Sequence, residues 1–398
     1  MNRRPLLDRV AWALLVVFVF SVPFEKALQI PGVGTASRLL GLLAFVTGAA
    51  VVTIGAIQQR RAARAPNLLL VLGTLFTAWS GATVLWSLAP SASAARFLTF
   101  AQLLAMAWLV WELCRTARQQ DWLLGAYVAG AALASVATIV RFALNRPTYW
   151  RRYAASGFDP NDLGLTVALS IPLALYLALK FTDWRRYALW AAMALADGAI
   201  LLSGSRTSLV AGILAFIFAA WRWRESALTA RVAAVILFLA LLLGPVGLAP
   251  AASRERLSTL HTELTKGTLH GRTRIWKAGL KAFKQRPIIG VGAGAYPVAV
   301  KPRLGVPAIP GHEYVAHNAF LSVLVEEGLV GFGLFGLMLA VAVVFAWVMP
   351  DRDRALWLIM LLVWGIGVST LTWEQRKPTW LLFALLTTAW ARSFREDK

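Results

Sequence analysis

The sequence has little charge and almost no cysteine. Only 15% of its 398 residues are charged, whereas about 25% is usual for a soluble protein. Because 59% of the residues are hydrophobic, neither a water-soluble surface nor a disordered chain can be built from this mixture. Cys114 is the single cysteine, which excludes an internal disulfide and any cysteine-based metal site. The composition therefore indicates an integral membrane protein.

Acidic residues are also scarce. The chain has 19 Asp and Glu against 40 Lys and Arg, a formal net charge of +21. In a soluble protein such a balance often signals nucleic-acid binding. In a membrane protein it indicates contacts with anionic lipid headgroups or an anionic substrate. We therefore expect membrane lipids, and no nucleic acid, among the partners.

Apolar runs recur along the whole chain. A spanning helix needs about 20 mostly apolar residues, and no segment alternates as the strands of a membrane barrel do, so the expected fold is all-α. The first run follows Arg3 and Arg4 but no small-x-small cleavage site follows it, so it is interpreted as an uncleaved helix. The sequence thus predicts a polytopic membrane protein with about 12 transmembrane helices. They are predicted at residues 9–24, 38–57, 67–88, 95–114, 122–143, 161–181, 184–203, 206–221, 228–248, 319–348, 354–373 and 378–394.

Lys and Arg in the short loops set the orientation of the predicted spans. If the N-terminus is cytoplasmic, the inner loops and span ends carry 19 of these residues and the outer ones carry ten, so both termini are expected inside. Residues 1–248 then hold spans one to nine, and residues 319–398 hold spans ten to twelve. Residues 249–318 form one long outer loop with amphipathic helices. Within it, residues 272–286 combine an apolar stripe with a basic remainder, which predicts a helix lying in the membrane interface.

Four polar motifs fall on the predicted outer face, and two of them contain candidate anion ligands. Arg206 opens an apolar run, and a helix N-terminus with a guanidinium is a site for phosphate. An arginine that extends to the headgroups is the alternative, but ionisable groups within spans are usually functional. Arg272 and Arg274 belong to a basic helix, whose ordinary role is a solvated or lipid-facing surface. The four motifs are Gly157–Gly164, Gly204–Ser208, Gly271–Trp276 with the following Pro287–Gly294, and His317–Leu321.

His317 precedes the longest apolar segment. As one helix, the residues from His317 to Met349 would measure about 50 Å, against about 30 Å of hydrocarbon. The helix must therefore project, with Glu326 and Glu327 at the outer interface and His317 near the tip. The positive N-terminal end of a helix keeps an imidazole neutral and able to accept a proton near pH 7. A surface histidine without a role is the alternative.

Other polar residues have ordinary structural explanations. Asp159 and Asn161 stand in a turn that starts the sixth span, and a turn with an N-cap accounts for them. No metal is expected, because the spacing of the available groups matches no helical ligand pair. Those groups are His270, His312, Glu313 and His317.

Taken together, the motifs resemble the O-antigen ligase and polymerase superfamily of polytopic membrane glycosyltransferases. The resemblance covers about residues 150–335. Arg206 and Arg272 match the family arginines assigned to the pyrophosphate, with Arg274 added as their neighbour. His317 matches the histidine assigned as the base. Asp159, Asn161 and Asn318 are expected to support the site. The matching features are Asp159-Pro-Asn161, Gly204-Ser-Arg206, Gly271-Arg-Thr-Arg-Ile-Trp276 with Pro287-Ile-Ile-Gly-Val-Gly292, and His317-Asn318 with Glu326-Glu-Gly-Leu-Val-Gly331.

The resemblance implies an O-antigen ligase of the bacterial inner membrane, with a periplasmic active site and loop and cytoplasmic termini. Such an enzyme transfers a glycan from undecaprenyl pyrophosphate to the lipid A core, in lipopolysaccharide biosynthesis, without a metal or other cofactor. Arginines would neutralise the departing phosphate, and a histidine base contributes about 10²–10⁴-fold. A polymerase of the same superfamily is the first alternative and a protein O-oligosaccharyltransferase the second. A solute transporter is the third, although the internal repeats typical of transporters are not visible.

Overall fold

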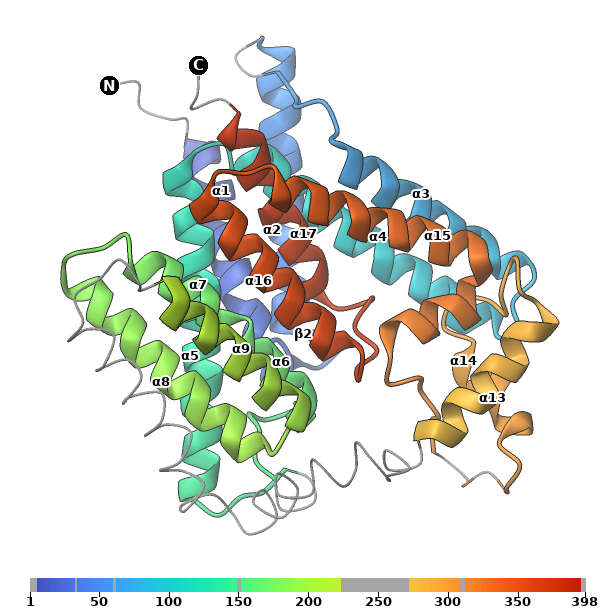
Figure 1. The fold of residues 1–398 in the computed structure, drawn as a ribbon. Helices are drawn as coiled ribbons and strands as arrows, with labels where there is room; N and C mark the ends of the chain where they lie inside the picture. Colours follow the sequence, from blue (N-terminus) through green and yellow to red (C-terminus); the bar gives the residue numbers. More distant parts are fainter. Residues whose placement is uncertain are drawn as a thin grey trace.

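The structure is a computed structural model, and it describes residues 6–32, 34–59, 62–148, 152–222, 272–307, 309 and 312–394. Over these ranges the protein is almost entirely α-helical (Figure 1). The strands of the described part are one antiparallel pair of two-residue segments, β1 (Gln29–Ile30) and β2 (Gly34–Thr35). The predicted all-α class is confirmed.

Eleven of the twelve predicted spans coincide with helices. The remaining one, residues 228–248, and residues 249–271 of the long loop lie outside the described residues. Short 3₁₀ segments, η1 (Val22–Phe24) and η2 (Thr83–Leu85), extend the first and third of the helices. These helices are α1 (Leu6–Ser21), α2 (Ala36–Ile57), α3 (Leu68–Ala82), α4 (Pro90–Leu113), α5 (Ala117–Ala143), α6 (Pro160–Ala168), α7 (Ser170–Ala178), α8 (Trp184–Ser203), α9 (Arg206–Arg222), α15 (Ala319–Trp347), α16 (Asp351–Val368) and α17 (Lys377–Ser393).

Seven helical segments of the described part are long and apolar enough to cross a membrane, so the chain is an integral membrane protein. The predicted count of twelve is not confirmed within the described residues. Four further helices, α8, α9, α16 and α17, lie at predicted positions but are too short or too charged to count as membrane spans by length and composition. For example, α16 begins with four alternating charges, Asp351–Arg354, and α17 has 17 residues. The seven segments are Leu6–Phe24, Ala36–Ile57, Leu68–Leu85, Pro90–Leu113, Ala117–Ala143, Pro160–Ala178 and Ala319–Trp347.

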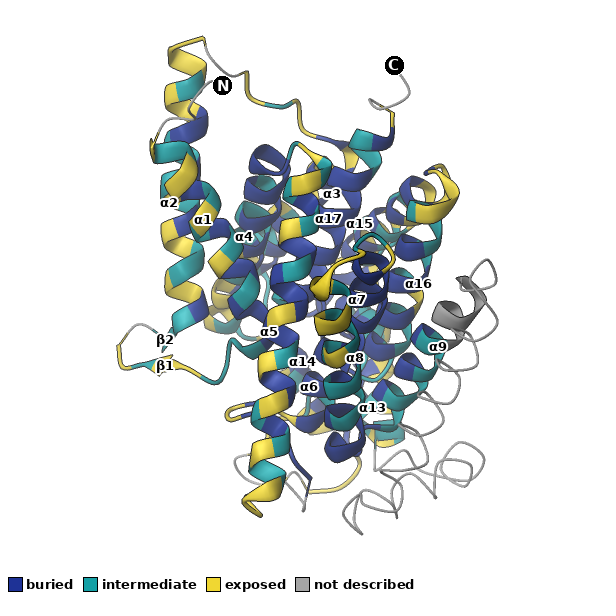
Figure 2. Cartoon of the chain, turned by 90° about the vertical axis from the view of Figure 1, so that its left-hand side faces the viewer, coloured by how far each residue is buried: buried dark blue, intermediate teal, exposed yellow. Residues whose placement is uncertain are grey.

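Burial separates the centre of the bundle from its lipid-facing edge. The segment formed by α6 and α7 is 94% buried and packs against α5, α8 and α9. Helix α2 is only 22% buried and stands at the left edge of Figure 2, with exposed apolar side chains along its length. Close packing at the centre depends on Gly164, where a Cβ would lie 2.5 Å from Ser208 Oγ.

Helix α15 is bent, and this corrects the prediction of one long projecting helix. Gly328 has φ 68° and ψ −167°, which divides α15 into Ala319–Glu327 and Leu329–Trp347. The second part is about 28 Å long at 1.5 Å per residue, close to the ~30 Å of hydrocarbon. The excess length is therefore accommodated by a break beside Glu326 and Glu327, not by a projecting tip.

A segment from the long loop pairs with the broken helix. Leu329 N donates to Pro287 O (2.8 Å) and Gly292 N donates to Glu326 O (2.8 Å), with two similar bonds between them. Backbone groups freed by a helix break need such partners in a membrane protein. Gly290 is essential here because its φ is +72° and a Cβ would lie 2.3 Å from Glu326 O. The glycine-rich motif thus serves to complete the helix.

The predicted amphipathic helix of the long loop is α13 (Arg272–Gln285), followed by α14 (Tyr296–Val300) and η4 (Lys301–Arg303). Its small residues Ala278, Gly279 and Ala282 are buried against α14 and α15. Leu280, on the apolar side of the helix, is exposed, and the predicted position of α13 in the membrane interface stays a prediction. The basic side chains of the helix point outward: Arg274, Lys277, Lys281 and Lys284 are exposed.

Candidate active site

The polar motifs meet at one end of the bundle, at the bottom of Figure 1. Arg152 joins the first two: its Nη2 donates to Asn161 Oδ1 (2.9 Å) and its Nε donates to Ser203 O (2.5 Å). Its side chain is buried, with 3% of the residue exposed. A buried guanidinium in such contacts fixes the turn before α6 against the end of α8.

Asp159 and Asn161 maintain that turn. Asp159 is the N-cap of α6, and its Oδ1 accepts from Asn161 N (2.8 Å). The side-chain oxygen of Asn161 is used by Arg152. The turn-and-cap explanation of these two residues is therefore confirmed. A direct role at the substrate stays a prediction.

Arg206 is the first residue of α9, directly after a tight turn. Helix α8 ends at Gly204, whose left-handed conformation (φ 57°, ψ 26°) reverses the chain. Ser205 Oγ lies 2.8 Å from Ser208 Oγ within the first turn of α9. The half-buried Arg206 thus stands at a helix N-terminus, where the helix dipole favours an anion.

The loop between α16 and α17, residues 369–377, connects the motifs to one another. Thr370 Oγ1 donates to Thr207 Oγ1 (2.9 Å), next to Arg206. At its other side Asn318 Nδ2 donates to Ser369 O (3.1 Å). The sequence does not mark this loop, because residues 369–373 fall within the span predicted at residues 354–373. The signal that could have found it is the polar stretch Glu374–Lys377 between two apolar segments.

His317 stands immediately before α15 in a constrained conformation. Its φ is 47°, a left-handed value that costs a non-glycine residue about 1–3 kcal/mol and tends to occur at functional sites. The backbone is held there because His317 N donates to Thr372 Oγ1 (3.0 Å). Asn318 is the N-cap of α15, and its Oδ1 accepts from Leu321 N (2.9 Å). Asn318 thus stabilises the start of α15 directly after the histidine.

The surroundings of His317 keep its ring neutral. The pKa of the imidazole is lowered to about 4, first by burial and second by the nearby Arg272 guanidinium, while Asp159 and Asp162 act in the opposite direction. The neutral state was predicted from the helix end. The observed causes are instead burial and a neighbouring cation. Arg272, Asp159 and Asp162 thus lie close enough to His317 to act on its ring electrostatically.

Asp162 is the ionic centre of this end of the bundle. Its carboxylate accepts from Lys26 Nζ (3.0 Å), Arg376 Nη2 (2.8 Å) and Trp373 Nε1 (3.0 Å). Only 9% of the residue is exposed. Because all three contacts come from distant segments, Asp162 ties α6 to the start of the chain and to the loop 369–377.

The two predicted arginines of α13 have different surroundings. Arg272, at the start of the helix, is half buried and acts electrostatically on His317. Arg274 is exposed and makes no ion pair within the described part of the chain. Among the described residues there is no group of three or more His, Cys, Asp and Glu side chains that could hold a metal ion.

Comparison with known proteins finds a family match for part of the chain. Residues 191–336 match the model of a family described as O-antigen ligase. This part of the chain thus resembles an O-antigen ligase domain. The domain includes Arg206, Arg272, Arg274 and His317, and the recognition made from the motifs is confirmed.

Two curated proteins are similar to parts of the chain. The general O-oligosaccharyltransferase of Acinetobacter baylyi is 28% identical over 233 residues, which are 56% of this chain and 40% of that protein. The exopolysaccharide production protein ExoQ of Rhizobium meliloti is 38% identical over 80 residues, 19% of this chain and 18% of that protein. The matched part thus spans less than half the length of each relative.

Proposed function

We propose that the protein is an O-antigen ligase that transfers a glycan from undecaprenyl pyrophosphate to the core oligosaccharide of lipid A. The observation that carries the proposal is the placement of a largely buried, neutral His317 beside Arg272 within an O-antigen ligase domain. A base next to a fixed cation suits a reaction in which a hydroxyl loses its proton while a phosphate departs.

In the proposed reaction the acceptor hydroxyl oxygen attacks the anomeric carbon of the donor glycan. A new carbon–oxygen bond forms, the bond between the anomeric carbon and the phosphate oxygen breaks, and its electron pair stays on the diphosphate. Arg206 and Arg272 bind that diphosphate, with Arg274 at the outer edge. The hydroxyl proton passes to the imidazole of His317. The products are the glycosylated acceptor and the lipid diphosphate, and no metal takes part.

Donor binding would also adjust the base. A pKa of about 4 leaves His317 a weak base when the site is empty. A diphosphate held by Arg206 and Arg272 brings negative charge close to the ring, which raises the pKa of the imidazole. The pKa of His317 would thus approach 7 only when the donor is bound, which favours proton transfer in the complete complex.

We place the site on the periplasmic side of the bacterial inner membrane, with both termini in the cytoplasm. The excess of Lys and Arg in the loops at the opposite end supports this orientation. A second candidate acceptor is a protein, since the Acinetobacter baylyi relative is named an O-oligosaccharyltransferase. A third is another lipid-linked glycan, as in a polymerase, and the relative named for exopolysaccharide production supports it.

The test is a transfer assay with purified protein, a lipid-diphosphate-linked glycan and EDTA. Lipid A core, a second lipid-linked repeat unit and an acceptor protein are supplied separately. We expect glycan on lipid A core, and a loss of rate of about 10²–10⁴-fold for His317→Ala. His312→Ala is the matched control, because His312 is an exposed histidine of the same loop, and it should retain activity within about threefold. Product on either of the other acceptors alone, or full activity of His317→Ala, would overturn the assignment.

A further inference from the structure

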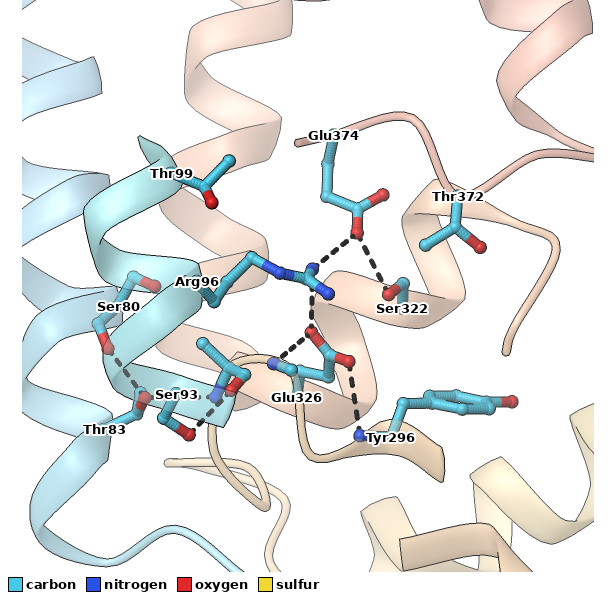
Figure 3. A network of polar contacts seen from close by, with 12 residues as sticks. Ser80, Thr83, Ser93, Arg96, Thr99, Tyr296, Ser322, Glu326, Thr372 and Glu374 are labelled. Atoms are coloured by element: carbon cyan, nitrogen blue, oxygen red, sulfur yellow. Dashed lines mark hydrogen bonds and ion pairs between the residues drawn. The ribbon is translucent and has the colours of Figure 1, made fainter. Parts of the chain in front are cut away.

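A buried cluster of charges lies beside the candidate active site, outside the residues assigned to the reaction. Arg96 of α4 contacts Glu374 Oε1 (3.2 Å) and Glu326 Oε2 (3.4 Å) through one guanidinium nitrogen (Figure 3). The two carboxylates are almost fully buried, with side-chain exposures of 1% and 4%, and that of Arg96 is 14%. One cation thus joins α4, α15 and the loop 369–377.

On one side the cluster holds the segment that completes the broken helix. Glu326 Oε2 accepts from Gly294 N (2.8 Å), and Glu326 Oε1 accepts from Tyr296 N (3.2 Å). Tyr296 in turn packs against α13, since its hydroxyl donates to Ile275 O (3.2 Å). Arg96 is therefore connected, through Glu326 and Tyr296, to the helix that begins with Arg272.

On the other side the cluster holds the first turn of α15. Glu374 Oε1 accepts from Ser322 Oγ (3.1 Å), while two residues earlier Thr372 accepts from His317 N. The loop 369–377 thus holds the histidine and the turn that follows it at two points. Arg96 favours the ionised form of Glu374, because it lowers the pKa of that carboxyl, whereas burial raises it, to about 7 overall.

Stability alone does not account for such a cluster. Buried ion pairs seldom stabilise more than apolar side chains of similar volume, and one attested use of buried polar groups is to define a unique geometry. Here the geometry defined is that of His317 and, through Tyr296, of the start of α13. We propose that Arg96, acting through Glu374 and Glu326, is a positioning residue for His317. This inference rests on the proposed function of His317 as the base.

The test compares Arg96→Met, Arg96→Lys and Ser322→Ala in the transfer assay. Displacement of a reacting group by about 1 Å can reduce rates by about 10²-fold. We expect Arg96→Met to lower kcat by about 10–100-fold with the KM for the lipid-linked donor within threefold, and Arg96→Lys to restore part of the loss. Ser322→Ala removes a single hydrogen bond to Glu374, so it should remain folded and lower kcat by about three- to tenfold.

The matched control is Glu112→Gln, because Glu112 lies at the opposite end of α4 from Arg96. Glu112 is also fully buried in an ion pair, with Arg115 (2.9 Å), so its replacement reproduces the general cost of losing a buried charge. We expect Glu112→Gln to lower the Tm but to leave kcat within threefold. An equal loss of kcat in Glu112→Gln and Arg96→Met at matched Tm would overturn the positioning role.

A readout independent of turnover separates this inference from the proposed function. The rate at which diethyl pyrocarbonate modifies His317, measured by peptide mapping, reports the setting of the ring in protein without substrate. We expect at least a threefold change of this rate in Arg96→Met and Ser322→Ala, with His312 unchanged. An unchanged rate at His317 together with normal kcat would refute the positioning role even if transfer is established. Absence of transfer by the wild-type protein, with the modification rate changed as expected, would refute the function alone.

Discussion

At the scale of single residues, His317 is defined by what surrounds it. A left-handed backbone, a hydrogen bond from its N–H to Thr372 and a capping Asn318 hold it before α15. Burial and Arg272 keep the imidazole neutral. The imidazole therefore stays unprotonated at neutral pH in the protein without donor, although it is placed where a proton acceptor is needed.

The first prediction concerns the pH dependence of kcat/KM, which reports the free enzyme. The active form of His317 is neutral, so activity is lost as the pH falls through its pKa of about 4. Arg272→Gln removes a nearby cation and therefore raises this pKa, which moves the acidic limb to higher pH. Arg274→Gln is the control, because that exposed neighbour should leave the limb in place. Equal limbs for both variants, measured over pH 3–8, would show that Arg272 does not act on the base.

The second prediction compares kcat with kcat/KM in the wild-type protein. Because the bound diphosphate adds negative charge near His317, the pKa of the imidazole should be higher in the complex than in the free enzyme. The acidic limb of kcat should therefore lie at least one pH unit above that of kcat/KM. Coincident limbs would mean that the diphosphate does not bind next to the histidine.

At the scale of elements, the break in α15 is the decisive feature. The helix is interrupted at Gly328, and the residues Pro287–Gly292 supply the hydrogen bonds that the interruption releases. This arrangement places a helix of membrane length on one side of the break and, on the other side, a short helix that begins directly after the candidate base and its capping Asn318.

The third prediction tests that break with two glycines of the same helix. Gly328 has φ +68° and its Cβ would lie 2.3 Å from Ile288 O, whereas a Cβ at Gly333 meets nothing within 4 Å. Gly328→Ala should destabilise the protein by more than ~2 kcal/mol, since strained φ values alone cost about 1–3 kcal/mol. Gly333→Ala should be neutral or slightly stabilising. The check is thermal unfolding in detergent. A Tm of Gly328→Ala equal to that of Gly333→Ala would contradict the described break.

Element positions were predictable, but the break was not. Eleven of the twelve spans predicted from apolar runs of about 20 residues coincide with helices, because a bilayer imposes that length. Hydropathy is high on both sides of Gly328, so composition could not reveal the bend. The bend depends on Pro287–Gly292, a segment almost forty residues earlier, and the partnership becomes visible only in three dimensions. For the same reason the sequence does not show that Ala278, Gly279 and Ala282 of α13 pack against α14 and α15.

At the scale of the whole molecule, distant segments converge on one end of the bundle. The arginines and the histidine that match the family motifs were identified from sequence because each stands in a short local pattern. Arg152, Asp162 and Arg96 were not identified as site organisers. Their partners lie elsewhere in the chain, as Asp162 with Arg376 shows, and no local pattern marks such pairs.

The fourth prediction concerns the orientation of that end. Native Cys114 is buried and its pKa is raised to about 12 by that burial, so it should not react with maleimides. Val306→Cys, in the loop before α15, and Asp351→Cys, at the opposite end, therefore report single sites. In intact spheroplasts an impermeant maleimide should label the cysteine at 306 but not the one at 351. The cysteine at 351 should be labelled only after the membrane is permeabilised. The reverse pattern would place the site in the cytoplasm.

The central claim is that the guanidiniums at the start of α9 and α13 bind a diphosphate next to His317. The most direct measurement is an experimental structure of the protein with a lipid-diphosphate-linked glycan bound. The account predicts diphosphate oxygens within hydrogen-bonding distance of Arg206 and Arg272, with the anomeric carbon close enough to His317 for one sugar hydroxyl to fit between them. A diphosphate bound at the opposite end of the bundle, or away from these arginines, would contradict it.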